Sequence, residues 1–180
     1  MKAFDQTMFA AMDLHWLATL LTGSREVAAD VAVQAIESAR DETSFFSNWM
    51  SAWSRRLVIA RALTAIREEL GASARRTELR SEKGSAIPPR SWMLARQTTK
   101  SDLERALLSI DLFPRAAVLL LLFEGVPLQD AAVLLDAEPG LVRKGQAAGV
   151  VELTSALARI QGWQLKNGRS NQLQSEFQHA

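Results

Sequence analysis

The side chains that could do covalent or metal chemistry are few in this chain of 180 residues. Cysteine is absent, and histidine occurs only as His15 and His179. The sequence therefore excludes a thiol nucleophile and a disulfide, and a zinc site or a Ser-His triad would have to use His15 alone. Acidic pairs such as Glu68-Glu69 are adjacent in sequence, so they do not converge on one helix face. These residues predict no enzyme, no metal site and no cofactor.

The basic residues are the second group that could act, because guanidinium groups bind phosphates. The formal net charge is only +1, but residues 54–105 carry twelve bases against six acids, and residues 1–53 carry three against seven. The basic segment includes Arg55, Arg56, Arg61 and Arg67. It could track the phosphates of a nucleic acid, or it could be a solvated helix face followed by a soluble linker.

Helices must position these residues, because apolar side chains recur at spacings of three and four and no strand pattern is found. The first proline is Pro88, which favours long helices before it. The spacing predicts helices over about 3–21, 25–40 and 45–70, with Gly23 in the left-handed position after the first and Gly71 closing the third. Shorter helices are predicted over about 102–110, 114–124, 127–135 and 139–160.

The composition changes at residues 72–98, which contain few apolar side chains and resemble a flexible linker. We therefore predict an all-α protein of two small helical domains, with a first domain at 1–73, a linker at 74–100, a second domain at 101–163 and a polar tail at 164–180. In the second domain, a short helix, a tight turn and a further helix are typical of a helix-turn-helix. The longest apolar run, Ala116 to Phe123, is too short to span a membrane, so we predict a cytoplasmic protein without membrane insertion.

Two stretches of the chain resemble the bacterial extracytoplasmic-function sigma factors. Glu124-Gly125, Leu128 to Ala132, and the run from Pro139 to Lys144 resemble the family's helix-turn-helix, and no gap is needed from Arg115 to Leu153. Leu20 to Glu26, followed by Ala28 and Asp30, resembles the helix pair that grips the RNA polymerase clamp. Trp53, Ile59 to Leu63 and Arg67 resemble the helix that reads the −10 element. Together the two stretches cover roughly 100 residues of the chain.

The resemblance implies a protein that binds core RNA polymerase and directs transcription initiation by contacting promoter DNA, with an anti-sigma or other regulatory protein as a further partner. The expected polymerase-binding residues are Glu26, Asp30 and Gln34. The expected DNA-binding residues are Arg143, Lys144, Arg55, Arg56, Arg61 and Arg67.

The second reading is a sigma-fold protein that has lost promoter recognition and acts as a protein–protein interaction module. Where the family carries further arginines in its recognition helix, this chain has Gly145, Ala148, Val150 and Val151. Extra apolar surface there would favour a protein partner over DNA. Gly145 and Gly149 either let another helix approach closely or have no packing role.

Overall fold

The computed structural model describes the backbone of residues 2–40, 47–82 and 98–160 and the side chains of residues 11–37, 53–80 and 98–160. All regular structure in these ranges is helical, which confirms the predicted all-α class. The first half contains α1 (Lys2–Thr22), α2 (Arg25–Arg40), α3 (Ser47–Ala65) and α4 (Arg67–Glu82). The second half contains α5 (Lys100–Leu108), α6 (Leu112–Val118), the π-helical turn η1 (Leu119–Phe123), α7 (Leu128–Leu135) and α8 (Pro139–Ile160).

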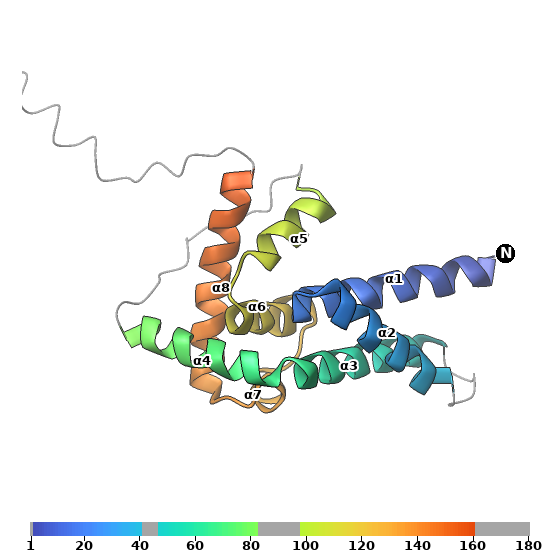
Figure 1. The fold of residues 1–180 in the computed structure, drawn as a ribbon, viewed down its shortest axis with the longest axis horizontal. Coiled ribbons are helices and arrows are strands. Elements are labelled where there is room, and N and C mark those ends of the chain that lie inside the picture. The colour runs from blue at the N-terminus through green and yellow to red at the C-terminus, as the bar shows by residue number, and fades with distance from the viewer. Residues whose placement is uncertain (1, 41–46, 83–97, 161–180) are drawn as a thin grey trace, which may run out of the picture.

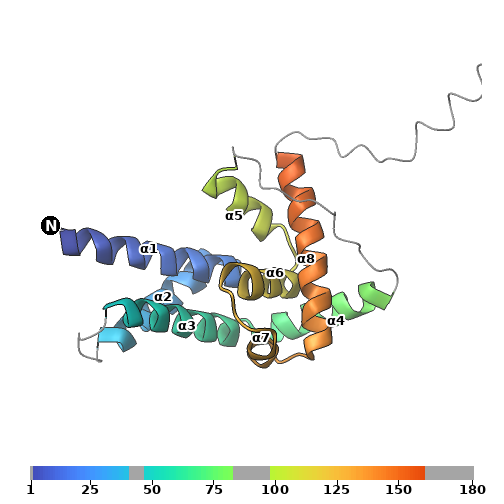
Figure 2. The ribbon, with the colours of Figure 1, turned by 180° about the vertical axis from the view of Figure 1, so that it is seen from behind.

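The first three helices pack on one another, and their boundaries follow local signals (Figures 1 and 2). Gly23 has φ 73°, the left-handed conformation predicted for it between α1 and α2. The hydroxyl of Ser24 then accepts a hydrogen bond from Val27 N at 3.3 Å, as an N-cap residue does. Along α2 the buried side chains are Ala28, Val31, Ala32 and Ala35, which leaves the opposite face to solvent.

The predicted third helix over 45–70 is wrong in two respects, because it is divided at Ile66 and continues beyond Gly71 as α4. No proline or glycine occurs within four residues of Ile66, so packing accounts for the division. Helix α3 packs on α1 and α2, whereas α4 packs on α6 and α8. Gly71 lies inside α4 without a positive φ.

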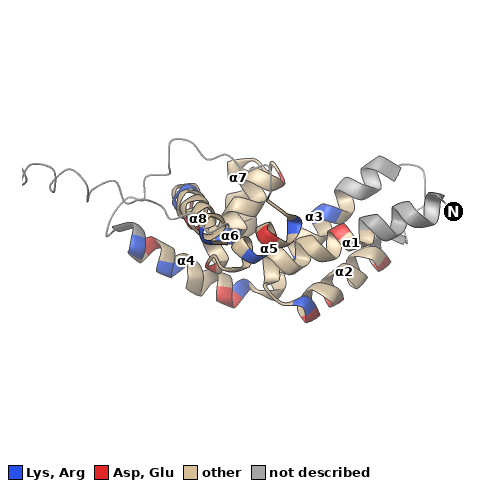
Figure 3. Cartoon of the chain, turned by 90° about the horizontal axis from the view of Figure 1, so that it is seen from above, with Lys and Arg blue, Asp and Glu red and all other residues tan. Residues whose placement is uncertain are grey.

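The predicted linker also starts too early, since residues 74–82 belong to α4. The buried face of α4 includes small polar side chains, Ser73 and Thr77, which a search for apolar spacing does not detect. Figure 3 shows acidic and basic residues mixed along the same helix, and this composition resembles a soluble connection. Residues 83–97 of the linker and residues 164–180 of the tail lie outside the described ranges.

Helix α4 docks on the second half through polar contacts as well as apolar ones. The buried Ser73 hydroxyl accepts a hydrogen bond from Phe113 N at 2.8 Å, which satisfies one of the unpaired N–H groups at the start of α6. One turn further, Arg76 donates two hydrogen bonds to Asp111, the N-cap residue of α6. Because of these bonds, the pKa of Asp111 lies below its ordinary value.

Both halves contribute to one apolar core in the described structure. Leu20 and Leu63 from the first half and Phe113, Leu120 and Leu153 from the second are all buried in it. A polar contact adds to this packing at the surface, where Trp16 Nε1 donates to Glu104 at 3.1 Å and links α1 to α5. The division into two domains stays a prediction, but the described helices of the two halves are in direct contact.

Candidate nucleic-acid interface

Helices α7 and α8 are joined by a turn of three residues, Asp136 to Glu138. Asp136 adopts the left-handed conformation, with φ 50° and ψ 50°, which aspartate tolerates better than most residues. Ala137 N donates to Ala132 O at 3.1 Å and so closes the end of α7. The turn lets α8 leave at an angle to α7 and pack against α6 (Figure 1).

Arg143 and Lys144 occupy the second turn of α8, and both are exposed. Neither forms an ion pair or hydrogen bond with any residue of the described ranges. The adjacent residues, Val142 and Gly145, are buried on the opposite face of the helix. The two cations are therefore held on the outer face of α8 by the packing of its inner face.

Gly145 and Gly149 provide the close helix approach that was one of the two predictions for them. A Cβ atom at Gly145 would lie 2.8 Å from the ring of Phe113, and one at Gly149 would lie 2.6 Å from the carbonyl oxygen of Pro114. Both contacts are with α6, so the two glycines let the backbone of α8 approach the Phe113 ring and the backbone of α6 closely. The same Cβ atom at Gly149 would also lie 2.6 Å from Cγ2 of Val118.

Beyond Lys144, the outer face of α8 carries small neutral side chains. Ala147, Ala148 and Val151 are half-buried, whereas Val150 is buried. The large exposed apolar side chains of the second half lie elsewhere, at Leu122, Phe123 and Val133. The apolar surface expected along 147–151 is thus only partly present.

The four predicted arginines of the first half have different surroundings. Arg55 forms an ion pair with Glu124 at the end of η1, with Nε donating to Oε2 at 3.0 Å. The hydrogen bonds to Glu124 raise the pKa of Arg55, although partial burial opposes this shift. Arg56 and Arg67 are exposed and make no hydrogen bond or ion pair within the described ranges. Of the four arginines predicted to bind DNA from the first half, these two have guanidinium groups that remain available to a ligand.

Arg61 contacts a residue predicted for a different partner. Its Nη1 donates to Gln34 Oε1 at 2.7 Å, which joins α3 to α2. Gln34 was predicted to bind polymerase and Arg61 to bind DNA, so the structure brings one member of each predicted set together. Arg61 is half-buried, and the contact fixes its orientation along the α2–α3 seam.

The three predicted polymerase-binding residues lie on one face of α2. Glu26, Asp30 and Gln34 are spaced by four, and all three are exposed. Residues at this spacing are neighbours on the helix surface. They form a polar stripe, which we call the α2 stripe (Glu26, Asp30 and Gln34), on the side of α2 that faces away from its buried alanines.

Sequence reasoning missed Arg115 as a candidate binding residue. Its side chain is 6% exposed, and its Nε is buried without a hydrogen-bond partner in the described structure. One signal was available, since Arg115 is the only charged residue between Asp111 and Glu124 in an otherwise apolar helical run. Such a position predicts burial of the guanidinium group.

Searches for membrane spans, metal clusters and similar proteins gave negative results. No helix of the described ranges is both long and apolar enough to cross a membrane. In the same ranges, no three His, Asp or Glu side chains are grouped closely enough to hold a metal ion. Comparisons of the chain with family models, with curated proteins and with solved structures found no match.

Proposed function

We propose that this protein acts like a sigma factor, binding core RNA polymerase and directing transcription initiation through DNA contacts. The observation that carries the proposal is the exposed pair Arg143 and Lys144 in the second turn of α8, directly after the turn from α7. In helix-turn-helix proteins, residues near the start of the second helix reach the base edges of the major groove. The local sequence resemblance to the sigma-factor helix-turn-helix covers the same residues.

In this proposal the protein binds and orients, and it performs no bond chemistry. Arg143 would contact two acceptors on a guanine or a phosphate, and Lys144 would contact a phosphate as a point charge. Arg56 and Arg67 would add phosphate contacts from the first half. We assign no DNA contact to Arg55 in the ion-paired state, because its guanidinium is already satisfied by Glu124.

The α2 stripe is the proposed polymerase contact. Its two carboxylates are exposed, and neither makes an ion pair within the described ranges, so both remain available to a basic surface. The buried alanines behind the stripe hold α2 against α1 and α3, which fixes the stripe on a rigid element.

Gel filtration with core polymerase tests this contact. We expect a complex at micromolar concentration that is lost in the double variant Glu26→Lys/Asp30→Lys. The matched control is Asp130→Lys/Glu138→Lys, which makes the same charge change at two exposed acids of the second half. Absence of a complex with the wild-type chain, or equal loss in both variants, would contradict the proposal.

A salt titration of DNA binding tests the role of α8. The slope of log K against log salt falls by about one unit for each phosphate contact removed. We expect Arg143→Ala/Lys144→Ala to lower the slope by up to about two units. The control variant Arg75→Ala/Arg159→Ala removes two other exposed cations and should leave most of the slope unchanged. Equal slopes for the two double variants would remove Arg143 and Lys144 from the DNA interface.

A protein-interaction module is the second candidate, favoured by a groove of about 870 Å³ between α3 and α7. Phe123 and Val133, which line it, are 41% and 81% exposed. Substitution at Val133 tests this candidate better than substitution at the buried Val150, which would disturb the fold. If Val133→Arg abolishes concentration-dependent self-association while DNA binding by the wild-type chain is absent, the second candidate replaces the first.

A further inference from the structure

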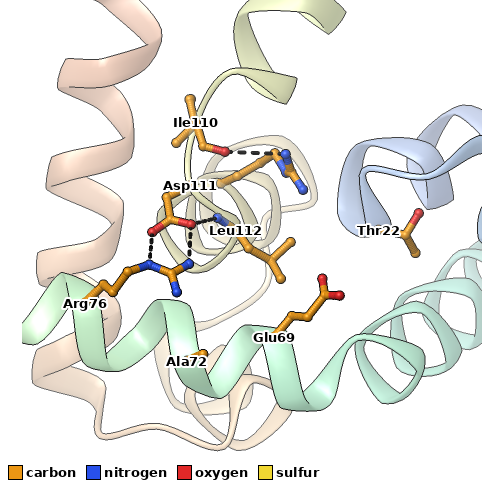
Figure 4. A pocket seen from close by; sticks show the side chains of 8 residues that line it. Thr22, Glu69, Ala72, Arg76, Ile110, Asp111 and Leu112 are labelled. Carbon is orange, nitrogen blue, oxygen red and sulfur yellow. Dashed lines mark hydrogen bonds and ion pairs between the residues drawn. The ribbon is translucent and has the colours of Figure 1, made fainter.

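A cavity of about 390 Å³ lies where the end of α1, the first turns of α4 and the start of α6 meet (Figure 4). Its lining combines residues that are far apart in the sequence, including Thr22, Glu69, Arg76, Asp111 and Arg115. Four of these five side chains carry a charge at neutral pH, and the cavity opens to solvent, where Glu69 and Arg76 are exposed. This density of charge at a helix junction needs a physical explanation.

Arg115 is the buried charge of the cavity, with 6% of its surface exposed. Its Nη1 donates to the carbonyl oxygens of Leu108 and Ile110, both at 3.4 Å, and its Nε has no partner. No carboxylate of the described ranges forms an ion pair with it. Burial lowers the pKa of Arg115, but an arginine remains protonated in a protein. The carboxylate of Asp111 favours the protonated guanidinium through its charge but makes no hydrogen bond to it in the described structure, so part of the desolvation penalty remains for a bound carboxylate to offset.

The other charges of the cavity decide which ligand fits. Arg76 and Asp111 satisfy each other through two hydrogen bonds of 3.0 and 2.8 Å, so this pair contributes little net charge. Glu69 is exposed, and its carboxylate makes no hydrogen bond or ion pair within the described ranges. The cavity therefore presents one available positive group and one available negative group. A simple anion is repelled by Glu69, and a simple cation is repelled by Arg115.

We propose that this cavity binds a small zwitterion, whose carboxylate contacts Arg115 and whose ammonium group contacts Glu69. The chemical class is a free amino acid or a similar small molecule with separated charges. Arginine is suited to the first role because its planar guanidinium matches the geometry of a carboxylate. The site does not depend on the DNA or polymerase contacts proposed above, because none of its residues belongs to those surfaces.

Thermal unfolding of the full chain with a series of ω-amino acids tests the proposal. Glycine, β-alanine, 4-aminobutyrate, 5-aminovalerate and 6-aminohexanoate carry the same two charges at increasing separation, so they measure the distance between the two groups. Acetate and methylammonium, each at the same 10 mM concentration, carry one charge only. A ligand at ten times its Kd raises the folding equilibrium constant about elevenfold, which corresponds to about 3 to 5 °C in the unfolding midpoint. We expect one chain length to give the largest rise and the single-charge probes to give less than a third of it.

Variants then assign the effect to the two side chains. Glu69→Gln should remove the advantage of the zwitterion over acetate, whereas Glu68→Gln, at the adjacent exposed glutamate that does not line the cavity, should keep it. Arg115→Met should abolish binding of every probe. Because it replaces a buried charge by an apolar side chain, we expect the variant to fold, and circular dichroism checks this independently of binding. The proposal is overturned if no zwitterion shifts the midpoint, if the shift is independent of chain length, or if it persists in Glu69→Gln.

Discussion

The close packing of α6 on α8 leads to a sharp prediction at Gly149. A Cβ atom there would lie 2.6 Å from Pro114 O and 2.6 Å from Val118 Cγ2, whereas ordinary contact begins at 3.4 Å. Relief therefore needs a movement of about 0.8 Å, the difference between those two distances. Because one of the two atoms is backbone, it cannot move by a rotamer change, so α6 or α8 has to shift as a whole.

The magnitude follows from two opposed terms. Alanine is favoured over glycine in a helix interior by about 1 kcal/mol. Overpacking of a well-filled core costs about 1–3 kcal/mol, and contact with backbone places Gly149→Ala in the upper part of that range. We expect Gly149→Ala to lower the free energy of unfolding by about 1–2 kcal/mol, which is the overpacking cost after the helix gain is subtracted.

Gly71→Ala is the matched control, because Gly71 lies inside α4 with nothing within 4 Å of the added Cβ atom. It should raise the free energy of unfolding by up to about 1 kcal/mol, since only the helix preference acts. The preference cancels in the difference between the two variants, which should be about 2–3 kcal/mol, or about 4–12 °C in the unfolding midpoint for a chain of this size.

Urea and thermal unfolding, followed by circular dichroism and by tryptophan fluorescence, measure this difference. Gly145→Ala should fall between the two variants, because its close contact is with the ring of Phe113, which can shift more readily than backbone. A Gly149→Ala protein as stable as Gly71→Ala would refute the close approach of α6 and α8.

Two further predictions concern the docking of α4 on α6. Ser73→Ala leaves the buried N–H of Phe113 without its partner, so it should lower the free energy of unfolding by about 1–3 kcal/mol in urea titrations. The control Thr64→Ala removes an exposed hydroxyl that is bonded within α3 and should change the free energy of unfolding by less than about 0.5 kcal/mol. Asp111→Asn keeps the N-cap of α6 but loses the charge bonded to Arg76. The pKa of Asp111 is lowered in the folded protein. Its stabilising contribution is therefore complete above the unfolded pKa of about 3.9 and is lost as the pH falls through the folded pKa. The unfolding midpoint of Asp111→Asn should accordingly fall less between pH 5 and pH 2 than that of the wild type.

The sequence predicted most helices because their ends carry local signals. Gly23 and Gly125, both with positive φ, stand after helical runs, and prolines stand at or near the start of α6, α7 and α8. The division at Ile66 and the extent of α4 could not be predicted in this way. They depend on the surfaces that α3 and α4 contact, and Ser73 becomes a buried residue only because α6 starts opposite it.

The exposure of several candidate residues was predictable from the sequence, but their pairings were not. Exposure of Arg143, Lys144, Glu26 and Asp30 follows from their place opposite the apolar stripes of α8 and α2. The ion pair between Arg55 and Glu124 joins residues 69 positions apart, and no local pattern indicates it. Tertiary contacts of this kind decide which cations of a basic segment remain available to a ligand.

The small number of available cations on α8 is compatible with the proposed function if polymerase delivers the protein to DNA. Non-specific binding of an isolated protein to DNA has a Kd of about 0.1 mM or less at physiological salt. Binding of the α2 stripe to polymerase would hold α8 near the DNA, and linked contacts of this kind reach an effective concentration of about 1 mM, roughly tenfold higher than that Kd, so weak contacts become occupied in the complex. Crosslinking of Arg143 and Lys144 to promoter DNA should therefore be strong with core polymerase present and weak for the chain alone. Equal crosslinking under both conditions would mean that α8 binds DNA without help from the α2 stripe.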